Sequence, residues 1–265
     1  MAAIPIDDPH DPRVAAFVDI RERDLTGRQG LFVAEGEVVL RVLASPASLC
    51  RPVAALFADR RLVSLGEVTA GLPSDVPVYA ASQSVLDRIA GFHLHRGVLA
   101  LGEKPAALPL DDLIAAAPGN SVVVVACGVG NHDNIGGIFR AAAAFGAAAV
   151  LLDRHCCDPF YRKAIRVSVG AVLRTPMVAG LEAETTIESL KAAGFRVIAM
   201  SPGATAPLHL VPGGGRVAIV LGSEGPGLPA SLLGRCDSVA IPMSGGFDSL
   251  NVATAGAIAL HHFTR

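Results

Sequence analysis

Three glycine-rich segments in the C-terminal half of the chain hold polar side chains capable of chemistry. In the first, Asn134 opens a helical stretch and Arg140 follows six residues later, with Gly136 and Gly137 between them. A guanidinium is permanently charged and carries fixed donors, so it suits anion binding and the stabilisation of developing negative charge. Each glycine costs about 1 kcal/mol relative to alanine inside a helix, which indicates close approach by another backbone or a ligand. A helix cap at Asn134 and a solvated charge at Arg140 would explain the same residues.

The second segment follows an apolar strand candidate and runs from Leu221 to Leu228. Gly222, Gly225 and Gly227 surround a single charge, Glu224. Glycines allow positive φ and let a ligand lie against the backbone, although a tight turn needs the same residues.

The third segment joins the end of a strand to the last helix. Ile241-Pro242-Met243 ends the strand, a flexible loop follows, and Ser249 and Asn251 stand where the helix would begin. A hydroxyl and an amide at this place could position a reacting group, whereas Ser249 could also serve only as an N-cap.

Strands and helices that alternate along the chain must position these segments. Residues 122–127 form a continuous apolar, β-branched run, which is typical of a parallel strand covered on both faces. The expected strands are 122–127, 148–152, 196–200 and 217–221, and the expected helices are 135–145, 186–193 and 249–263. The sequence therefore predicts an α/β fold with a parallel sheet, with functional loops after residues 127, 221 and 241 at the carboxyl ends of strands.

The front of the chain, residues 1–103, is predicted to be a separate small α/β domain. Its expected helices are 14–24, 37–43, 62–70 and 84–90, and its expected strands are 31–34, 52–58 and 76–79. Residues 104–120 are rich in proline and alanine and are predicted to be a linker, which leaves 121–265 as the second domain.

The composition excludes several classes of protein. With 51% hydrophobic and 17% charged residues among 265, global disorder is excluded, and no run approaches the roughly 18 apolar residues of a membrane span. The first residues lack a secretory signal and the five cysteines form no C-x-x-C pair, so we expect a cytoplasmic protein with reduced thiols and no membrane partner. The net charge of −2 gives no global sign of a polyanionic partner.

The three segments, in this order and spacing, are similar to the three motifs of the SpoU (TrmH-type) RNA ribose methyltransferases of the SPOUT superfamily. The similarity covers roughly residues 120–263, and residues 166–171 also resemble the segment between the first two motifs. Residues 32–37 resemble the small ribosomal-protein-like RNA-binding domain often joined to such enzymes. The family often has Asp-Pro-x-Asn before the first helix, whereas residues 131–134 are Asn-His-Asp-Asn and lack the proline.

The resemblance implies a SPOUT-type parallel sheet with a C-terminal trefoil knot, a homodimer, and S-adenosyl-L-methionine as the cofactor, with no metal. It implies methyl transfer to a ribose 2′-OH. The implied cofactor-binding residues are Leu221, Gly222, Gly227, Ile241, Met243 and Leu250. The implied catalytic residues are Asn134, Arg140, Glu224, Ser249 and Asn251. Because a guanidinium scarcely deprotonates, we expect Arg140 to anchor phosphate and stabilise the alkoxide, with the proton acceptor left open. Glu224 is expected either to orient Arg140 or loop amides, or only to hold the structure of its own loop.

RNA affinity is expected to come from a local basic stretch. Between residues 154 and 174 the only acidic residue is Asp158, and aromatic residues, among them Phe160, are interleaved. The expected RNA-binding residues are Arg154, Tyr161, Arg162, Lys163 and Arg166. The arginines within residues 13–28 form a weaker second candidate. Structured RNA is the expected partner, with ribosomal RNA favoured over transfer RNA because of the front domain.

Other readings of the same residues remain open. A non-catalytic RNA-binding or ribosome-assembly protein could keep this fold, and a transfer RNA methyltransferase could share its motifs. A dinucleotide-dependent oxidoreductase is disfavoured because Asp133 replaces the third glycine of the G-x-G-x-x-G pattern that begins at Gly128. Residues 155–158 lack zinc-ligand spacing, and His93 and His95 have no evident partner, so no role is assigned to them.

Overall fold

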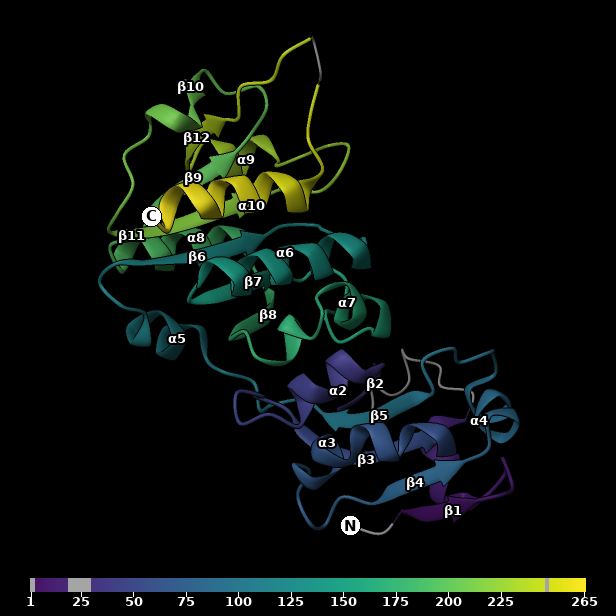
Figure 1. The fold of residues 1–265 in the computed structure, drawn as a ribbon. Helices are drawn as coiled ribbons and strands as arrows, with labels where there is room; N and C mark the ends of the chain where they lie inside the picture. Colours follow the sequence, from purple (N-terminus) through teal and green to yellow (C-terminus); the bar gives the residue numbers. More distant parts are fainter. Residues whose placement is uncertain (1–2, 19–29, 246–247) are drawn as a thin grey trace. The chain divides into compact units, whose positions relative to one another are not determined.

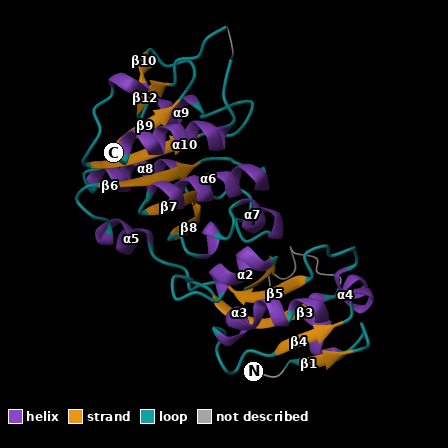
Figure 2. Cartoon of the chain, in the orientation of Figure 1, coloured by secondary structure: helices purple, strands orange, loops and turns teal. Residues whose placement is uncertain are grey.

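The computed structural model describes residues 3–18, 30–245 and 248–265. The chain folds into two compact units, each with its own sheet (Figures 1 and 2). Unit 1 comprises Met1–Pro105 and Asp158–Arg174, and unit 2 comprises Ala106–Cys157 and Thr175–Arg265. The sequence analysis predicted one boundary between the domains, the linker 104–120. In the structure, residues 158–174 also belong to unit 1, so the chain passes between the units more than once.

Unit 1 is built on a mixed sheet in which the described strands have the order β1-β4-β3-β5-β2. Strands β1, β4 and β3 are parallel, and β5 is antiparallel to both β3 and β2. The strands are β1 (Ile4–Ile6), β2 (Leu31–Glu35), β3 (Arg51–Ala58), β4 (Val78–Ala81) and β5 (Val98–Glu103). The helices are α2 (Glu37–Leu43), α3 (Gly66–Ala70), α4 (Gln83–Ala90) and α7 (Arg162–Val167), with short 3-10 turns at Pro12–Phe17, Asp59–Arg61, Val63–Leu65 and Ala171–Leu173.

The returning segment 158–174 fixes itself to unit 1 through buried contacts. The Phe160 ring is 6% exposed and its centroid lies 5.2 Å from that of Phe32. Lys104 Nζ lies 2.8 Å from Asp158 Oδ2. The expectation that Phe160 offers a surface for base stacking is therefore wrong, since the ring fills the core of unit 1.

Unit 2 has a parallel sheet, as the sequence predicted, and its described strands have the order β10-β12-β9-β11-β6-β7-β8. The strands are β6 (Ser121–Ala126), β7 (Ala149–Asp153), β8 (Met177–Leu181), β9 (Arg196–Met200), β10 (Ala206–Pro207), β11 (Arg216–Leu221) and β12 (Asp237–Ala240). The helices are α5 (Leu110–Ala116), α6 (His132–Phe145), α8 (Ala183–Ala192), α9 (Ala230–Leu233) and α10 (Val252–Phe263), with a 3-10 turn at Leu208–Leu210. The central strands are fully buried, which accounts for their unbroken apolar runs.

Helices α6 and α10 lie side by side against the sheet (Figure 1). A Cβ on Gly137 would come within 2.7 Å of the Ala253 Cβ, and one on Gly256 would come within 2.8 Å of Leu221 Cδ1. The close approach expected from the helical glycines is confirmed for Gly137, and the neighbouring element is the last helix.

The segment expected to be a plain linker contains helix α5, which packs on the core of unit 2 through Leu113 and Ile114. Arg216 on β11 holds the end of this helix. Its Nη2 donates to the carbonyls of Ile114 at 2.8 Å and Ala117 at 2.6 Å, and its Nη1 donates to the carbonyl of Ala193 at 2.8 Å. A cation at a helix C-terminus satisfies carbonyls that have no partner within the helix.

Several helix ends differ from the expected ones. The last helix begins at Val252 with Asn251 as its cap, so Ser249 is not the N-cap. Helix α6 is capped by Asn131, which leaves Asn134 buried in the first turn. Of the expected helix 14–24, the structure has the 3-10 turn Pro12–Phe17, and residues 19–29 lie outside the described part. None of the helices in the described ranges is long and apolar enough to cross a membrane.

Candidate functional site

A cavity of about 540 Å³ opens where the loops after β9, β11 and β12 meet the start of α10. All of the residues that the resemblance implied for cofactor binding line it: Leu221, Gly222, Gly227, Ile241, Met243 and Leu250. Glu224, Ser249 and Asn251 line the same cavity. The structure therefore brings these residues together around one cavity, because the carboxyl ends of neighbouring parallel strands share one edge of the sheet.

The glycine loop after β11 needs its glycines for two different reasons. Gly225 and Gly227 have φ values of 92° and 69°, a region that side chains with a Cβ rarely adopt. A Cβ on Gly222 would come within 2.6 Å of the Leu228 backbone nitrogen, so the loop folds back directly onto this residue. The Gly227 N–H closes the turn by donating to the Ser223 carbonyl at 3.2 Å.

Three of the expected catalytic side chains form one hydrogen-bonded chain beside the cavity. The Asn251 Oδ1 caps α10 by accepting from the backbone N–H groups of Ala253 at 3.0 Å and Thr254 at 3.3 Å. Its Nδ2 must then point the other way, where it donates to Asn134 Oδ1 at 2.8 Å and to Glu224 Oε1 at 3.4 Å. The cap therefore sets the orientation of the amide, and the amide links the first, second and third glycine-rich segments.

The Asn134 side chain retains an unused donor. The residue is 4% exposed and its Nδ2 has no hydrogen-bond partner among the described residues. An unpaired buried donor costs about 1–3 kcal/mol, so such groups are uncommon away from sites that receive a ligand or water.

Arg140 lies apart from this chain of hydrogen bonds. It is exposed near the middle of α6, does not line the cavity, and has no ion-pair or hydrogen-bond partner among the described residues. Six residues of α-helix correspond to about 600° of rotation, so Arg140 and Asn134 project from different sides of α6. The expected contact between Glu224 and Arg140 is absent from the described part of the chain, where Glu224 instead accepts from Asn251.

A second cavity of about 420 Å³ lies beyond β6, β7 and β8 and shares Ser223, Pro226 and Gly227 with the first. Asp153 stands in its wall and accepts from the Gly128 N–H at 3.0 Å. The functional loop expected after residue 127 therefore lines this second cavity instead of the first.

Cys127 lines the second cavity, and Cys156 follows another of its lining residues, His155, in the chain. Burial raises the pKa of the Cys127 thiol and raises the pKa of Cys156 to about 12. Thiolates are the nucleophilic and metal-ligating form, so neither group suits covalent chemistry at neutral pH. Among the described residues, no three His, Cys, Asp or Glu side chains gather as a metal site requires.

The expected RNA-binding residues are divided between the two units, and acidic side chains from elsewhere meet them. Arg154 in unit 2 forms an ion pair with Glu182. In unit 1, Arg162 and Arg166 lie 3.6 and 3.9 Å from the same carboxylate oxygen of Glu35. The sequence suggested a basic stretch with one acid because these partners lie far away along the chain.

The other two members of that set lie at the start of α7. Tyr161 is half-buried as the residue before the helix, and Lys163 is exposed in its first turn.

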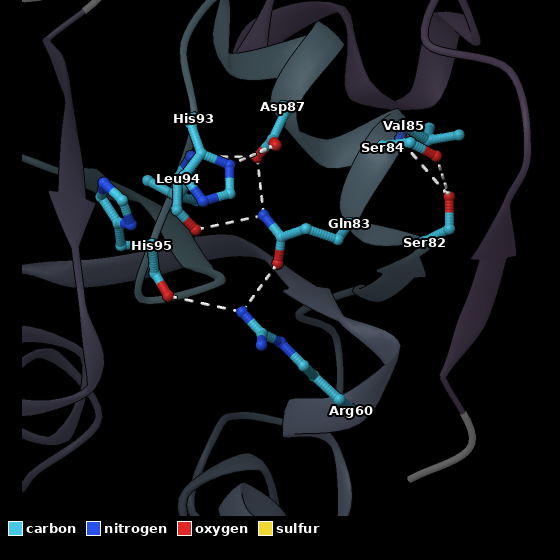
Figure 3. Close-up of polar contacts among 9 residues, drawn as sticks. All are labelled: Arg60, Ser82, Gln83, Ser84, Val85, Asp87, His93, Leu94 and His95. Atoms are coloured by element: carbon cyan, nitrogen blue, oxygen red, sulfur yellow. Dashed lines mark hydrogen bonds and ion pairs between the residues drawn. The ribbon is translucent and has the colours of Figure 1, made fainter.

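The expectation that His93 lacks a partner is corrected by the structure, because its Nδ1 lies 2.6 Å from Asp87 Oδ2 (Figure 3).

Comparison with known proteins places this architecture among RNA-modifying enzymes. The sequence model of the SpoU rRNA Methylase family matches residues 121–261. An uncharacterized tRNA/rRNA methyltransferase of Mycobacterium tuberculosis is 41% identical, covering 97% of this chain and 90% of its own length. A crystal structure of an RNA 2′-O ribose methyltransferase is 27% identical with a TM-score of 0.78, covering 98% of this chain and 97% of its own. An AdoMet-bound rRNA methyltransferase from Sinorhizobium meliloti, 24% identical over 98% of this chain and 97% of its own, shares the fold with a TM-score of 0.80.

Proposed function

Because this chain belongs to the SpoU rRNA methylase family, we propose that its RNA methyltransferase activity is directed to a ribose 2′-hydroxyl of ribosomal RNA. The observation that carries this proposal is the single cavity shared by the second and third glycine-rich segments, with the Asn134–Asn251–Glu224 chain at its border. The similarity to an RNA 2′-O ribose methyltransferase of known structure supports the choice of the ribose oxygen.

The cavity fits S-adenosylmethionine, the methyl donor of the reaction. Its volume of about 540 Å³ lies within the range of small-molecule sites, roughly 300–1,000 Å³. The glycine loop exposes its backbone to the cavity, and Ile241, Met243 and Leu250 provide apolar surface. We assign adenosine binding to these residues together with Leu221, Gly222 and Gly227. When bound, the cofactor supplies a methyl group on a positively charged sulfur.

The side chains of this chain have separate tasks in the transfer. Arg140 binds an RNA phosphate and stabilises the negative charge that develops on the ribose oxygen, since a guanidinium donates but does not accept protons. The Asn134 Nδ2 group has an N–H that is available to donate a hydrogen bond to a substrate oxygen. Asn251 holds this amide in place, and Ser249 and Glu224 line the cavity on the same side.

A homodimer belongs to the same proposal. Arg140 is exposed and lies outside the cavity of its own chain, so a second copy of the chain is needed to bring a guanidinium to the site. The symmetry of a dimer would supply the group to both cavities at once. The C-terminal trefoil knot is likewise proposed, supported by Ile241, Met243 and the residues 249–251, which line one cavity with the loop after β11.

Unit 1 is proposed to select the RNA, and its separate sheet and core suit a substrate-binding module. An additional unit of this kind favours a large structured substrate, which is why ribosomal RNA is preferred here to transfer RNA.

The activity can be tested with labelled methyl donor and total RNA from a strain that lacks the protein. A 2′-O-methyl group blocks alkaline cleavage of the adjoining phosphodiester bond, so label in alkali-resistant dinucleotides of ribosomal RNA is the expected result. Label in alkali-labile mononucleotides would refute ribose specificity, and label in transfer RNA would refute the choice of substrate. Arg140→Ala should abolish transfer while cofactor binding is retained.

The dimer can be tested by mixing two inactive variants. Arg140→Ala lacks the guanidinium, and Met243→Arg fills the cavity. If the guanidinium acts in the partner's cavity, random mixing restores about a quarter of the normal activity, because half the dimers are mixed and each has one complete site. Absence of recovery, with exchange of subunits confirmed, would contradict a shared site.

A further inference from the structure

The loop at residues 91–96, with the sequence Gly-Phe-His-Leu-His-Arg, forms a polar and aromatic cluster in unit 1. It connects α4 to β5 and starts at Gly91, whose φ of 77° ends the helix in the left-handed conformation. The cluster lies outside both cavities of unit 2, and the proposed reaction uses none of its side chains.

The middle of the 91–96 loop is anchored. Leu94 is 1% exposed in the core of unit 1, its N–H donates to Asp87 Oδ1 at 2.9 Å, and its carbonyl accepts from Gln83 Nε2 at 3.2 Å (Figure 3). The same Gln83 amide donates to Asp87 Oδ1 at 2.6 Å. A loop held in one conformation loses little entropy when it binds a partner.

The other side chains of the loop are exposed: Phe92, His93, His95 and Arg96. The His93 and His95 rings meet edge to face with centroids 4.4 Å apart. Because a carboxylate only accepts, His93 Nδ1 donates to Asp87 Oδ2 at 2.6 Å, which leaves Nε2 for a ligand. Phe92 is 39% exposed although the Arg162 guanidinium lies over its ring, 4.7 Å from the centroid.

Three arginines belong to the 91–96 loop, to the helix before it or to a contact with it. Arg60, Arg88 and Arg96 have no carboxylate partner among the described residues. Arg60 is directed to the loop, since its Nη2 donates to Gln83 Oε1 at 3.0 Å and to the His95 carbonyl at 3.5 Å (Figure 3). Such guanidinium groups are suited to phosphate oxygens.

We propose that the 91–96 loop binds an unpaired segment of the substrate RNA, with a base stacked on Phe92 or His95 and phosphates bound by Arg60 and Arg96. This inference rests on the proposed function, in that it takes RNA as the substrate. Exposed rings can stack on bases only where the bases are splayed out, as in loops and bulges, so a paired A-form helix is the poorer fit. The loop therefore contributes to the choice of RNA and leaves the chemical step unchanged.

Substitutions at Phe92 and Arg96 test the loop, because neither side chain belongs to the anchoring hydrogen bonds. In the full chain, Phe92→Ala should weaken binding to deproteinised ribosomal RNA by about tenfold, Phe92→Tyr should retain binding, and Phe92→Leu should resemble the alanine variant. Arg96→Ala should lower the salt slope of binding by about one. Arg51→Ala is the matched control. Arg51 on β3 lies opposite Glu103 in the strand register, at the end of β5 that is remote from the loop.

The kinetic readout separates this inference from the proposed function. With the methylated RNA, Phe92→Ala should raise KM about tenfold and leave kcat unchanged, whereas a general loss of folding would lower kcat and the melting temperature together. Unchanged binding and KM in both loop variants would overturn the role of the loop while methylation continues. If the wild-type protein binds ribosomal RNA but methylates none, the proposed function fails and the binding measurements still decide the role of the loop; if it binds no RNA, both fail.

Discussion

Substitution of Asn251 by alanine should destabilise unit 2, because this side chain has two structural tasks. Loss of the cap on α10 costs about 1 kcal/mol, within a range of roughly 0.5–2 kcal/mol. The buried Asn134 amide would also lose its partner at 2.8 Å, which costs about 1–3 kcal/mol. We therefore expect a loss of about 2–4 kcal/mol, or roughly 5–15 °C in the melting temperature.

Two further variants separate the tasks of Asn251. Asn251→Ser retains an oxygen for the cap but cannot reach Asn134, so it should lose only the second contribution. Asn251→Asp keeps the cap acceptor but removes the donor and places a carboxylate beside Glu224, so it should be less stable than the serine variant at neutral pH. Urea unfolding followed by circular dichroism gives each free energy of unfolding.

A double-mutant cycle with Asn134→Ala measures the contact between the two amides directly. The coupling free energy should be about 0.5–1.5 kcal/mol, as for other hydrogen-bonded pairs. Equal stability of the wild-type protein and Asn251→Ala would refute this reasoning altogether. Equal losses in the serine and alanine variants would show that the serine hydroxyl does not replace the cap.

Three other perturbations have outcomes set by the structure. Arg216→Ala should cost about 2–4 kcal/mol in urea unfolding and increase proteolysis within residues 104–120, because the end of α5 loses its charged donor. Gly137→Ala should destabilise by about 1–3 kcal/mol despite a better helix propensity, since its Cβ would lie 2.7 Å from that of Ala253, whereas Gly130→Ala, with open space around it, should change the melting temperature little. Burial raises the pKa of Asp87, but hydrogen bonds from its neighbours outweigh this and hold that pKa below its usual value. The ionised carboxylate therefore stabilises the folded protein above about pH 4, and this contribution is lost as the pH falls through the lowered pKa. Asp87→Asn should therefore be less stable than wild type at pH 7, and the difference should shrink in acid unfolding.

Local patterns in the sequence were sufficient for most of the central elements. The run 122–127 predicted a buried parallel strand, and β6 spans Ser121–Ala126. Helix 37–43 was predicted with the bounds that the structure has. These elements follow from short-range spacing, because a strand buried on both faces needs an unbroken apolar run and an amphipathic helix needs apolar residues three and four apart.

The parts that could not be predicted depend on partners distant in the chain. The segment 104–120 was predicted to be a linker because it is rich in proline and alanine, whereas helix α5 within it is held at its end by Arg216, about one hundred residues away. The basic stretch appeared unneutralised because Glu35 and Glu182 reach it from other segments. Edge strands β1 and β10 were missed because each is only two or three residues long.

The sequence by itself determined the chemistry available at the site: the residue types, their order, and the glycines that the loops require. The tertiary structure decided which side chains meet. Asn134 and Asn251 are 117 residues apart and become neighbours only because α6 and α10 pack closely enough to exclude a Cβ at Gly137. Local spacing constrains a residue's own element, whereas contact between elements depends on packing across the whole sheet, which no short stretch of sequence contains.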